Sequence, residues 1–173
     1  MKKSVISAVL AIAAASSANA HANLVEREAQ AGSTYVAEMR IAHGCEGEAT
    51  HTVRIDLPEG FVLAKPRPKA GWDLSVEFGT YAQTYDYHGP RTEGVTSITW
   101  SNGNLEDWQF DTFDFRAYLS PKVFHTGDTV YIPVHQYCAN GEHLWTEIPV
   151  EGQDRPAHPA PALKITGGAT HKH

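Results

Sequence analysis

The sequence lacks a surplus of basic residues, and this absence excludes two kinds of partner. Its 173 residues include 14 Lys and Arg against 20 Asp and Glu, which gives a formal net charge of −6. Nucleic acids and anionic membranes attract strongly basic surfaces. We therefore expect neither nucleic acid nor a membrane surface as a partner.

The motifs of several common enzyme classes are missing as well. The sequence contains no G-x-S-x-G, no H-E-x-x-H and no glycine-rich phosphate-binding loop. Each of these motifs places specific reactive groups at a fixed spacing, and no serine is marked here as a nucleophile. Nothing in the sequence thus nominates a hydrolase or a nucleotide-binding enzyme.

Long hydrophobic runs are absent except at the start of the chain. Lys2 and Lys3 precede an apolar run over residues 5–15, and Ala18 and Ala20 follow as small residues at an A-x-A cleavage site. This order is typical of a cleaved signal peptide, and the run is too short to span a bilayer. We predict a signal peptide over 1–20 and an exported, periplasmic or extracellular product without membrane insertion after cleavage.

Cleavage after Ala20 would make His21 the first residue of the mature protein. An N-terminal histidine carries an α-amine and an imidazole that can chelate one metal ion, which no internal histidine can do. Cleavage after Ala18 is the alternative. It would leave His21 third, where backbone amides could complete a square-planar Cu(II) site. A third interpretation is that cleavage merely happens to leave a histidine at this position.

Sulfur is scarce, whereas histidine is not. The chain has two cysteines and two methionines but 10 histidines, and Met39 is the only methionine after residue 20. In an exported protein, Cys45 and Cys138 are expected to form a disulfide. Since sulfur ligands would then be almost absent, a copper site here should prefer Cu(II) to Cu(I).

Hydrophobic alternation with a period of two predicts short strands and no helix. The expected strands cover residues 21–28, 34–41, 53–57, 72–78, 95–100, 113–119, 130–138 and 142–148. Residues 81–94 lack the pattern and are expected to form a tyrosine-rich loop. So many short strands predict a single antiparallel β-sandwich domain over 21–166. A flexible tail over 167–173 would carry His171 and His173, which could bind metal loosely.

Asn140-Gly141 is the strongest hairpin signal in the sequence. A two-residue turn there would place Cys138 opposite His143 and Gln136 opposite Trp145. Cys138, His143 and Trp145 would then share one face, because residues two apart on a strand do so.

The expected disulfide would bring a second segment to this face, because bonded cysteines lie within about 7 Å. His43 and Glu46 flank Cys45, so they would approach His143 and Trp145. Glu46 could supply an anionic oxygen to a divalent ion, with Glu48 as the alternative carboxylate.

The other candidates each have an ordinary structural interpretation. Trp145 could lie beside a metal but could equally pack in the core. His43 and His143 are weaker candidates, because histidines with satisfied or solvated nitrogens are common.

Several short motifs together resemble the YcnI-like family of exported copper-binding proteins. They span most of residues 21–150: the N-terminal His21, Ala31-Gly32-Ser33, His43-Gly44-Cys45-Glu46-Gly47, Pro66-x-Pro68-x-x-Gly71-Trp72, Ile98-Thr99-Trp100, Gln109-Phe110-Asp111-x-Phe113, Pro133-Val134-x-Gln136-x-Cys138 and Gly141-Glu142-His143-x-Trp145-x-Glu147-Ile148-Pro149.

The resemblance implies a cupredoxin-like or immunoglobulin-like sandwich that binds one Cu(II) per mature chain. His21 would form a single-histidine brace, a carboxylate of the Glu46 loop would join it, and Trp145 would lie beside the metal. The implied role is copper trafficking or homeostasis as a metallochaperone, with a copper transporter or another copper chaperone as partner. This loop differs from family members without cysteines, which leaves Glu46 and Glu48 both open.

Two other function classes compete with this interpretation. A copper mono-oxygenase would use a second histidine, His43 or His143, and the tyrosines of residues 81–87 would form its substrate face. A metal-free sandwich that binds a partner protein would use none of these residues for coordination.

Overall fold

The computed structural model describes residues 21–167, and these form twelve β-strands. The predicted signal peptide lies outside the described residues, as do His171 and His173. No helix in residues 21–167 is long and apolar enough to cross a membrane. The strands are β1 (Asn23–Leu24), β2 (Glu28–Gln30), β3 (Thr34–Ile41), β4 (Thr50–Asp56), β5 (Phe61–Pro66), β6 (Asp73–Asp86), β7 (Pro90–Ser101), β8 (Asp111–Leu119), β9 (Thr129–Tyr131), β10 (Val134–Cys138), β11 (Glu142–Trp145) and β12 (Ala162–Thr166).

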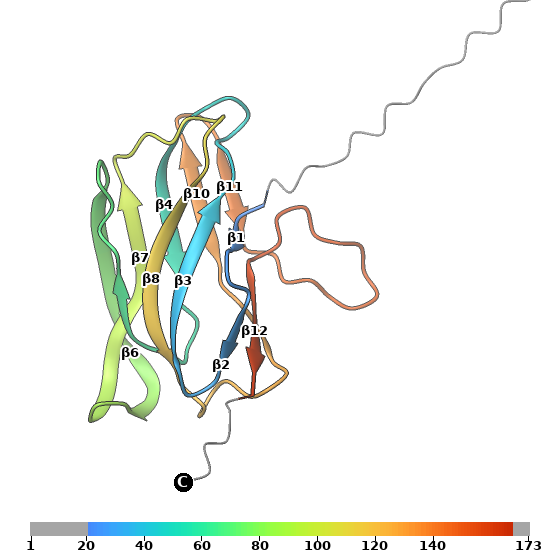
Figure 1. Ribbon diagram of the computed structural model, residues 1–173. Coiled ribbons are helices and arrows are strands. Elements are labelled where there is room, and N and C mark those ends of the chain that lie inside the picture. Colours follow the sequence, from blue (N-terminus) through green and yellow to red (C-terminus); the bar gives the residue numbers. More distant parts are fainter. Residues whose placement is uncertain (1–20, 168–173) are drawn as a thin grey trace, which may run out of the picture.

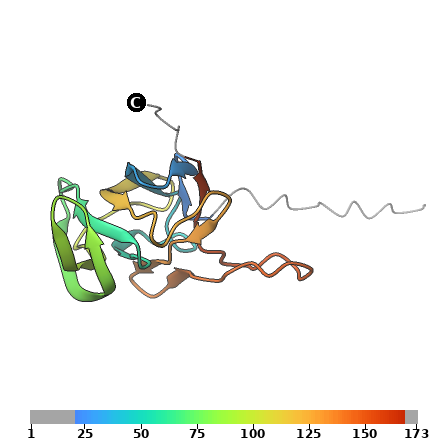
Figure 2. The same ribbon diagram turned by 90° about the horizontal axis from the view of Figure 1, so that it is seen from below.

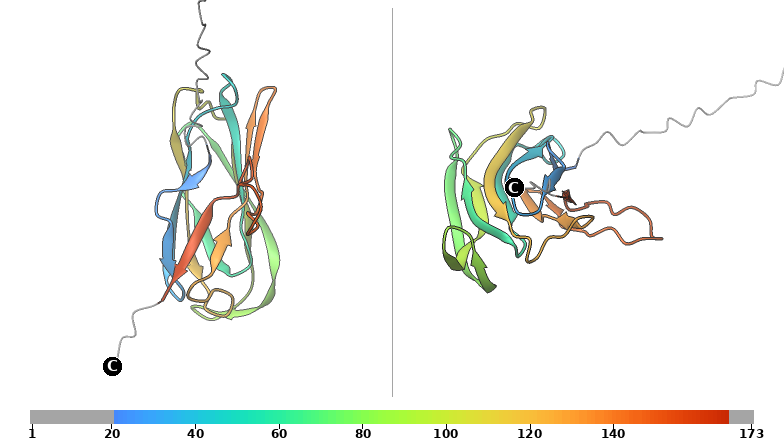
Figure 3. Two further views of the ribbon diagram at one scale, coloured as in Figure 1. Left: turned by 90° about the vertical axis from the view of Figure 1, so that its right-hand side faces the viewer. Right: turned by 60° about the horizontal axis from the view of Figure 1, so that its bottom comes forward.

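Two larger sheets form the layers of the sandwich (Figures 1 and 3). One has the strand order β1-β3-β8-β5 and the other the order β11-β10-β4-β7-β6. A smaller sheet, β2-β12-β9, contains the one parallel pairing among the described strands, that of β12 with β2. The prediction of an antiparallel β-sandwich is confirmed.

The core lies between the two larger sheets and follows from the alternation in the sequence. Residues that face inward on β3, β4, β7 and β8 are almost completely buried. They include Met39, Ile55, Trp100 and Phe113, each with 0% exposure. Trp100 also satisfies its indole N–H by donating to the Arg67 carbonyl at 3.1 Å, as burial of a polar atom requires.

The predicted loop over residues 81–94 is wrong. β6 continues to Asp86 and pairs with β7, forming the long hairpin at the lower left of Figure 1. The register shifts between Thr80 and Tyr85, and Tyr81 and Tyr85 are both buried. Such a bulge disrupts the period of two, which is why the alternation could not be recognised in the sequence.

Two other predicted strands are each divided in the structure. The segment 21–28 gives β1 and the start of β2, which belong to different sheets. The segment 130–138 is divided before Pro133, which has no backbone N–H to donate to a continuous ladder.

The hairpin of β10 and β11 turns one residue earlier than predicted. Gln136 pairs with His143 and Val134 with Trp145, so the predicted turn at Asn140-Gly141 is wrong. The loop is closed by the Cys138 N–H, which donates to the Gly141 carbonyl at 2.8 Å. The register differs from the predicted one by an even number of residues, so every side chain keeps its predicted face.

The segment 146–161 between β11 and β12 projects from the sandwich as a long loop (Figures 1 and 2). Two backbone hydrogen bonds hold its two arms together near the sandwich, from the Glu147 N–H to the His158 carbonyl at 3.1 Å and from the Ala160 N–H to the Glu147 carbonyl at 2.8 Å. The base of this loop lies beside the start of β1 and therefore beside His21.

Candidate metal centre

His21 directly precedes β1, and its ring has one bonded and one open nitrogen. Nε2 lies 3.2 Å from the Ala157 carbonyl oxygen. A carbonyl can only accept, so this contact assigns the proton to Nε2 and leaves a lone pair on Nδ1 of the neutral ring. Nδ1 is buried and has no hydrogen-bond partner among the described residues. The ring therefore presents an unused donor atom of the kind that binds metals.

Trp145 lies at the centre of a group of imidazoles. Its ring centroid is 5.4 Å from that of His21, 5.1 Å from that of His143 and 5.3 Å from that of His158. The side chain is 3% exposed. We call Trp145 with His21, His43, His143 and His158 the histidine cluster.

Gln136 connects the parts of this cluster. It is 1% exposed, and its Oε1 accepts from the Trp145 indole N–H at 3.0 Å. Its amide nitrogen donates to the His43 carbonyl at 2.7 Å and to Thr50 Oγ1 at 2.8 Å. Through these hydrogen bonds, Gln136 fixes the position of Trp145 relative to the loop that carries His43.

The disulfide fastens the same loop to β10. Cys45 and Cys138 are bonded, with Cα atoms 6.1 Å apart, which confirms the predicted pairing. The bond places the 43–48 loop beside the end of the hairpin that carries His143. The segments that contribute His43, Glu46, His143 and Trp145 therefore meet at one end of the sandwich, as the sequence predicts.

His43, like His21, has one bonded and one open ring nitrogen, but the two nitrogens exchange roles. Nδ1 lies 2.6 Å from the Gly44 carbonyl oxygen, so it carries the proton. Nε2 then holds the lone pair, and it is buried without a partner in the described part of the chain. The ring centroid lies 5.9 Å from that of His143.

His143 and His158 complete the cluster. Their ring centroids are 5.7 Å apart, and His143 Nε2 and His158 Nδ1 are buried without partners among residues 21–167. Burial lowers the pKa of His143, and the neighbouring His43 and His158 add to this effect while Glu46 opposes it. The neutral ring, which is the metal-binding form, is therefore favoured.

Sequence reasoning missed His158. It belongs to the 146–161 loop, which has no periodicity to place it. Glu147 positions it, since a Glu147 carboxylate oxygen accepts from the His158 N–H at 2.6 Å. Only the bare presence of a histidine could have drawn attention to it in the sequence.

The two candidate carboxylates differ in their bonding. Both oxygens of Glu48 accept from Asn140, one from the backbone N–H and one from the side-chain amide, each at 2.7 Å. These bonds lower the pKa of Glu48. Glu46 is exposed and has a positive φ of 51°, and within residues 21–167 it makes no side-chain hydrogen bond or ion pair. Glu46 is thus the carboxylate with free oxygens.

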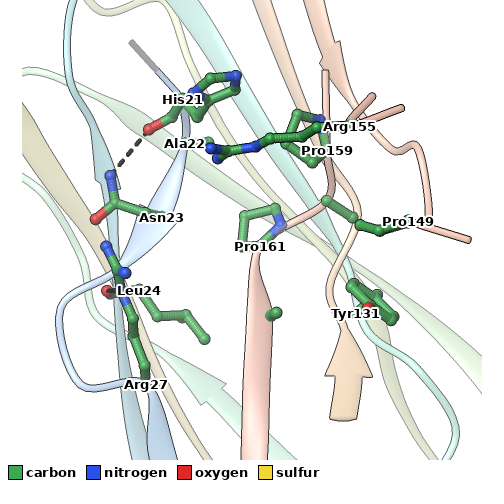
Figure 4. Close-up of a pocket in the computed structure, with 12 residues that line it drawn as sticks. His21, Ala22, Asn23, Leu24, Arg27, Tyr131, Pro149, Arg155, Pro159 and Pro161 are labelled. Carbon is green, nitrogen blue, oxygen red and sulfur yellow. Dashed lines mark hydrogen bonds between the residues drawn. The ribbon is translucent and has the colours of Figure 1, made fainter. Parts of the chain in front are cut away.

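Two pockets flank the cluster with opposite charge. A pocket of about 310 Å³ is lined by His143 and by Glu46, Glu48 and Glu142. The other, of about 260 Å³, lies between β1 and the 146–161 loop, and Arg27 and Arg155 line it with His21 (Figure 4). A cation is attracted to the acidic pocket and repelled from the arginine-lined one.

The structure does not bring all the predicted ligands into one coordination sphere. No three His, Cys, Asp or Glu side chains among residues 21–167 lie at the spacing of a formed metal site. His21 and Glu46 line different pockets and share no hydrogen bond or ion pair in this described part.

The aromatic face expected for a mono-oxygenase is also not where the sequence placed it. Tyr81 is 8% and Tyr85 1% exposed, so these rings cannot form an open substrate surface. Tyr87 stacks on Tyr118 with ring centroids 3.9 Å apart. The tyrosines form part of a second, structural cluster.

Comparison with known proteins gives a family and a fold. Residues 21–165 match the family model described as "Domain of unknown function (DUF1775)". A crystal structure of an uncharacterized protein from Nocardia farcinica, described as revealing an immunoglobulin-like fold, superposes with a TM-score of 0.65. It is 24% identical, and the match covers 84% of this chain and 98% of that one. No curated protein matches the chain.

Proposed function

The chain belongs to the DUF1775 family, and we propose that it is an exported Cu(II)-binding protein that holds one copper ion at His21. The YcnI-like proteins that its motifs resemble carry this same family description. The observation that supports the proposal most directly is the open Nδ1 of His21, which is buried without a partner in the described chain.

Nδ1 is the ring nitrogen that an N-terminal histidine needs for chelation. It is nearer to the α-amine than Nε2 is, so these two donors can close a ring on one metal ion. Nε2 meanwhile donates to the Ala157 carbonyl at 3.2 Å. Metal-bound histidines commonly donate the other ring N–H in this way, which fixes the ring and raises the basicity of the ligating nitrogen.

The remaining proposed contacts come from the acidic side of the cluster. Glu46 would supply a carboxylate, since Glu48 is engaged by Asn140 and Glu46 is not. Trp145 would lie beside the ion without ligating it, because its indole N–H is bonded to Gln136. Copper would enter from the pocket lined by Glu46, Glu48 and Glu142, where the carboxylates attract cations.

We propose carriage of copper rather than catalysis as the role of this site. The burial of Tyr81 and Tyr85 favours this choice over an oxygenase that acts on a polymer. The exported protein would then exchange Cu(II) with a copper transporter or another copper chaperone. A metal-free docking role would not account for the open imidazole nitrogens.

The test is His21→Ala in the mature chain. The α-amine remains, but it has no imidazole on the same residue with which to chelate a metal ion. We expect Cu(II) affinity at this site to fall by at least about 100-fold, the upper end of what loss of an outer partner costs a metal site. Competition titration against a chelator measures this, after intact mass has confirmed His21 as the first residue. Unchanged affinity would contradict the proposal.

A further inference from the structure

Three buried imidazole nitrogens in the histidine cluster are not used by the proposed brace. They are His43 Nε2, His143 Nε2 and His158 Nδ1, none of which has a hydrogen-bond partner in the described part of the chain. A buried polar atom without a partner is rare and costs free energy. Three such atoms in three adjacent rings require a common explanation.

The three rings form a continuous group, with His143 in the middle. Its centroid lies 5.9 Å from that of His43 and 5.7 Å from that of His158. His51 offers a contrast on the same side of the molecule. Its Nδ1 lies 2.8 Å from Thr52 Oγ1 and its Nε2 3.1 Å from the Cys138 carbonyl, so both of its nitrogens are used.

Each of the three residues has a different anchor. The proton of His43 Nδ1 is directed to the Gly44 carbonyl, and the His43 carbonyl accepts from Gln136. The backbone of His143 is held by the β10–β11 ladder, opposite Gln136. The backbone of His158 is held by its bonds with Glu147. The backbone positions of the three histidines are therefore fixed relative to one another.

We propose that His43, His143 and His158 form a second metal site, which binds a borderline divalent ion such as Zn(II) or Cu(II) through three imidazoles. Imidazole nitrogen is a preferred ligand of both ions, and three histidines are a known protein ligand set for Zn(II). The site adjoins the His21 brace through Trp145 but uses no atom of His21. It therefore does not depend on the proposed function.

Binding requires the three side chains to rotate toward one another. No three candidate ligands in residues 21–167 are already at metal-binding spacing. A bound ion would give the open nitrogens the partners that they lack.

The test counts metal ions in four forms of the mature chain. All four carry H171Q and H173Q, so that the terminal histidines do not contribute. They are the parent, the parent with His21→Ala, the parent with His143→Gln, and the combination of both changes. H125Q is the matched control, because the His125 side chain is 71% exposed and lies outside the cluster.

We expect the parent and the H125Q control to bind two Cu(II), each single change to remove one, and the combination to bind none. Zn(II) affinity of the His21→Ala form should fall by at least about tenfold on adding His143→Gln, since loss of even an outer partner costs a metal site this much. A single Cu(II) lost only with His21→Ala would overturn the second site and leave the brace. A single Cu(II) lost only with His143→Gln would do the reverse. Copper retained by the combination, or none bound by the parent, would overturn both.

A measurement that keeps all three proposed ligands guards against a variant that fails to fold. On addition of one equivalent of Zn(II) to the His21→Ala form, the imidazole NMR signals of His43, His143 and His158 should shift together. Those of His51 and His125 should not. Shifts confined to other histidines would overturn the proposal.

Discussion

The molecule contains two buried aromatic clusters, and they differ in how their polar atoms are satisfied. In the tyrosine cluster, the Tyr85 hydroxyl donates to Glu59, the Tyr81 hydroxyl accepts from the Leu63 N–H at 3.3 Å, and the Tyr87 hydroxyl lies 3.0 Å from Thr34 Oγ1. In the histidine cluster, one nitrogen of each of the four imidazoles is buried without a partner among the described residues.

Burial alone therefore does not separate a functional cluster from a structural one. Tyr85 is 1% and Trp145 3% exposed, so the two centres are equally shielded from water. The difference lies in open donor atoms, which cost stability unless a ligand occupies them. Substitutions should accordingly affect stability in the tyrosine cluster and metal binding in the histidine cluster.

The largest expected effect comes from removing the Cys45–Cys138 disulfide, which fastens only the histidine cluster. The bonded residues are separated by 93 positions. In the chain-entropy model, closing a loop of this length contributes about 4–5 kcal/mol to the free energy of unfolding. We expect C45S/C138S to lose stability of this order in urea denaturation and to bind Cu(II) more weakly.

Thiol titration of the unsubstituted exported protein is the companion measurement. It should detect no free cysteine without reductant. Two reactive thiols would instead allow a Cu(I) thiolate site, because Cu(I) prefers soft sulfur ligands. A fully stable C45S/C138S variant with normal copper affinity would show that the disulfide does not position the 43–48 loop.

The next effect concerns the tyrosine cluster. Burial, together with the hydrogen bond to Glu59, raises the pKa of Tyr85 to about 12. Tyr85→Phe removes a hydrogen bond to a charged group, which contributes roughly 1.5–3 kcal/mol to stability. We expect the loss at the low end of this range, because Glu59 is exposed and can be solvated, and we expect copper affinity to stay unchanged.

The same substitution should change the dependence of stability on pH. The pKa of Tyr85 is raised on folding, so its contribution is complete below about pH 10, the usual value for tyrosine, and is lost as the pH rises toward 12. The stability difference between the parent and Tyr85→Phe should shrink over this interval. A constant difference would mean that the folded protein does not raise this pKa.

The contrast between the clusters also explains what the sequence could predict. β3 alternates strictly, so its inward and outward residues could be assigned without a structure. The end of the β6–β7 hairpin over residues 81–94 could not be predicted, because a bulge separates Thr80 from Tyr85 in register and interrupts the alternation. Bulges depend on the pairing of two strands, and one strand's sequence does not reveal them.

The candidate site was predictable only where the chain carries a local signal or a covalent link. The hairpin and the disulfide placed His143, Trp145 and the 43–48 loop together, and the leader nominated His21. His158 reaches the cluster through backbone bonds between the arms of an irregular loop. Which nitrogens are open follows from carbonyls such as those of Ala157 and Gly44, which no sequence motif specifies.

A smaller effect should distinguish the two carboxylates of the 43–48 loop. Glu46→Gln should weaken Cu(II) binding by about tenfold, as for loss of one supporting contact at a metal site. Glu48→Gln should leave copper affinity nearly unchanged, because both Glu48 oxygens are engaged by Asn140. The reverse order in a chelator competition would assign the carboxylate to Glu48.

The effect of Glu48→Gln should appear instead in the stability of the protein at low pH. Hydrogen bonds from Asn140 lower the pKa of Glu48, so its contribution is present above the usual carboxyl pKa and is lost as the pH falls through the lowered value. The variant should show a weaker loss of stability on acidification than the parent. An equal loss of stability on acidification in both proteins would contradict a lowered pKa of Glu48.

The last prediction concerns Trp145, whose substitution should change the fluorescence signal of Cu(II) binding more than the Cu(II) affinity. The ring packs beside the imidazoles. Its indole N–H donates to Gln136 at 3.0 Å, so the indole offers no lone pair to a metal ion. Cu(II) bound at His21 should nevertheless quench Trp145 fluorescence, since the two rings are 5.4 Å apart. Trp145→Phe should abolish this quenching with little loss of affinity.

Trp108→Phe is the matched control, because Trp108 is 82% exposed and should contribute none of the quenched signal. Quenching that survives Trp145→Phe and disappears with Trp108→Phe would place the copper outside the histidine cluster.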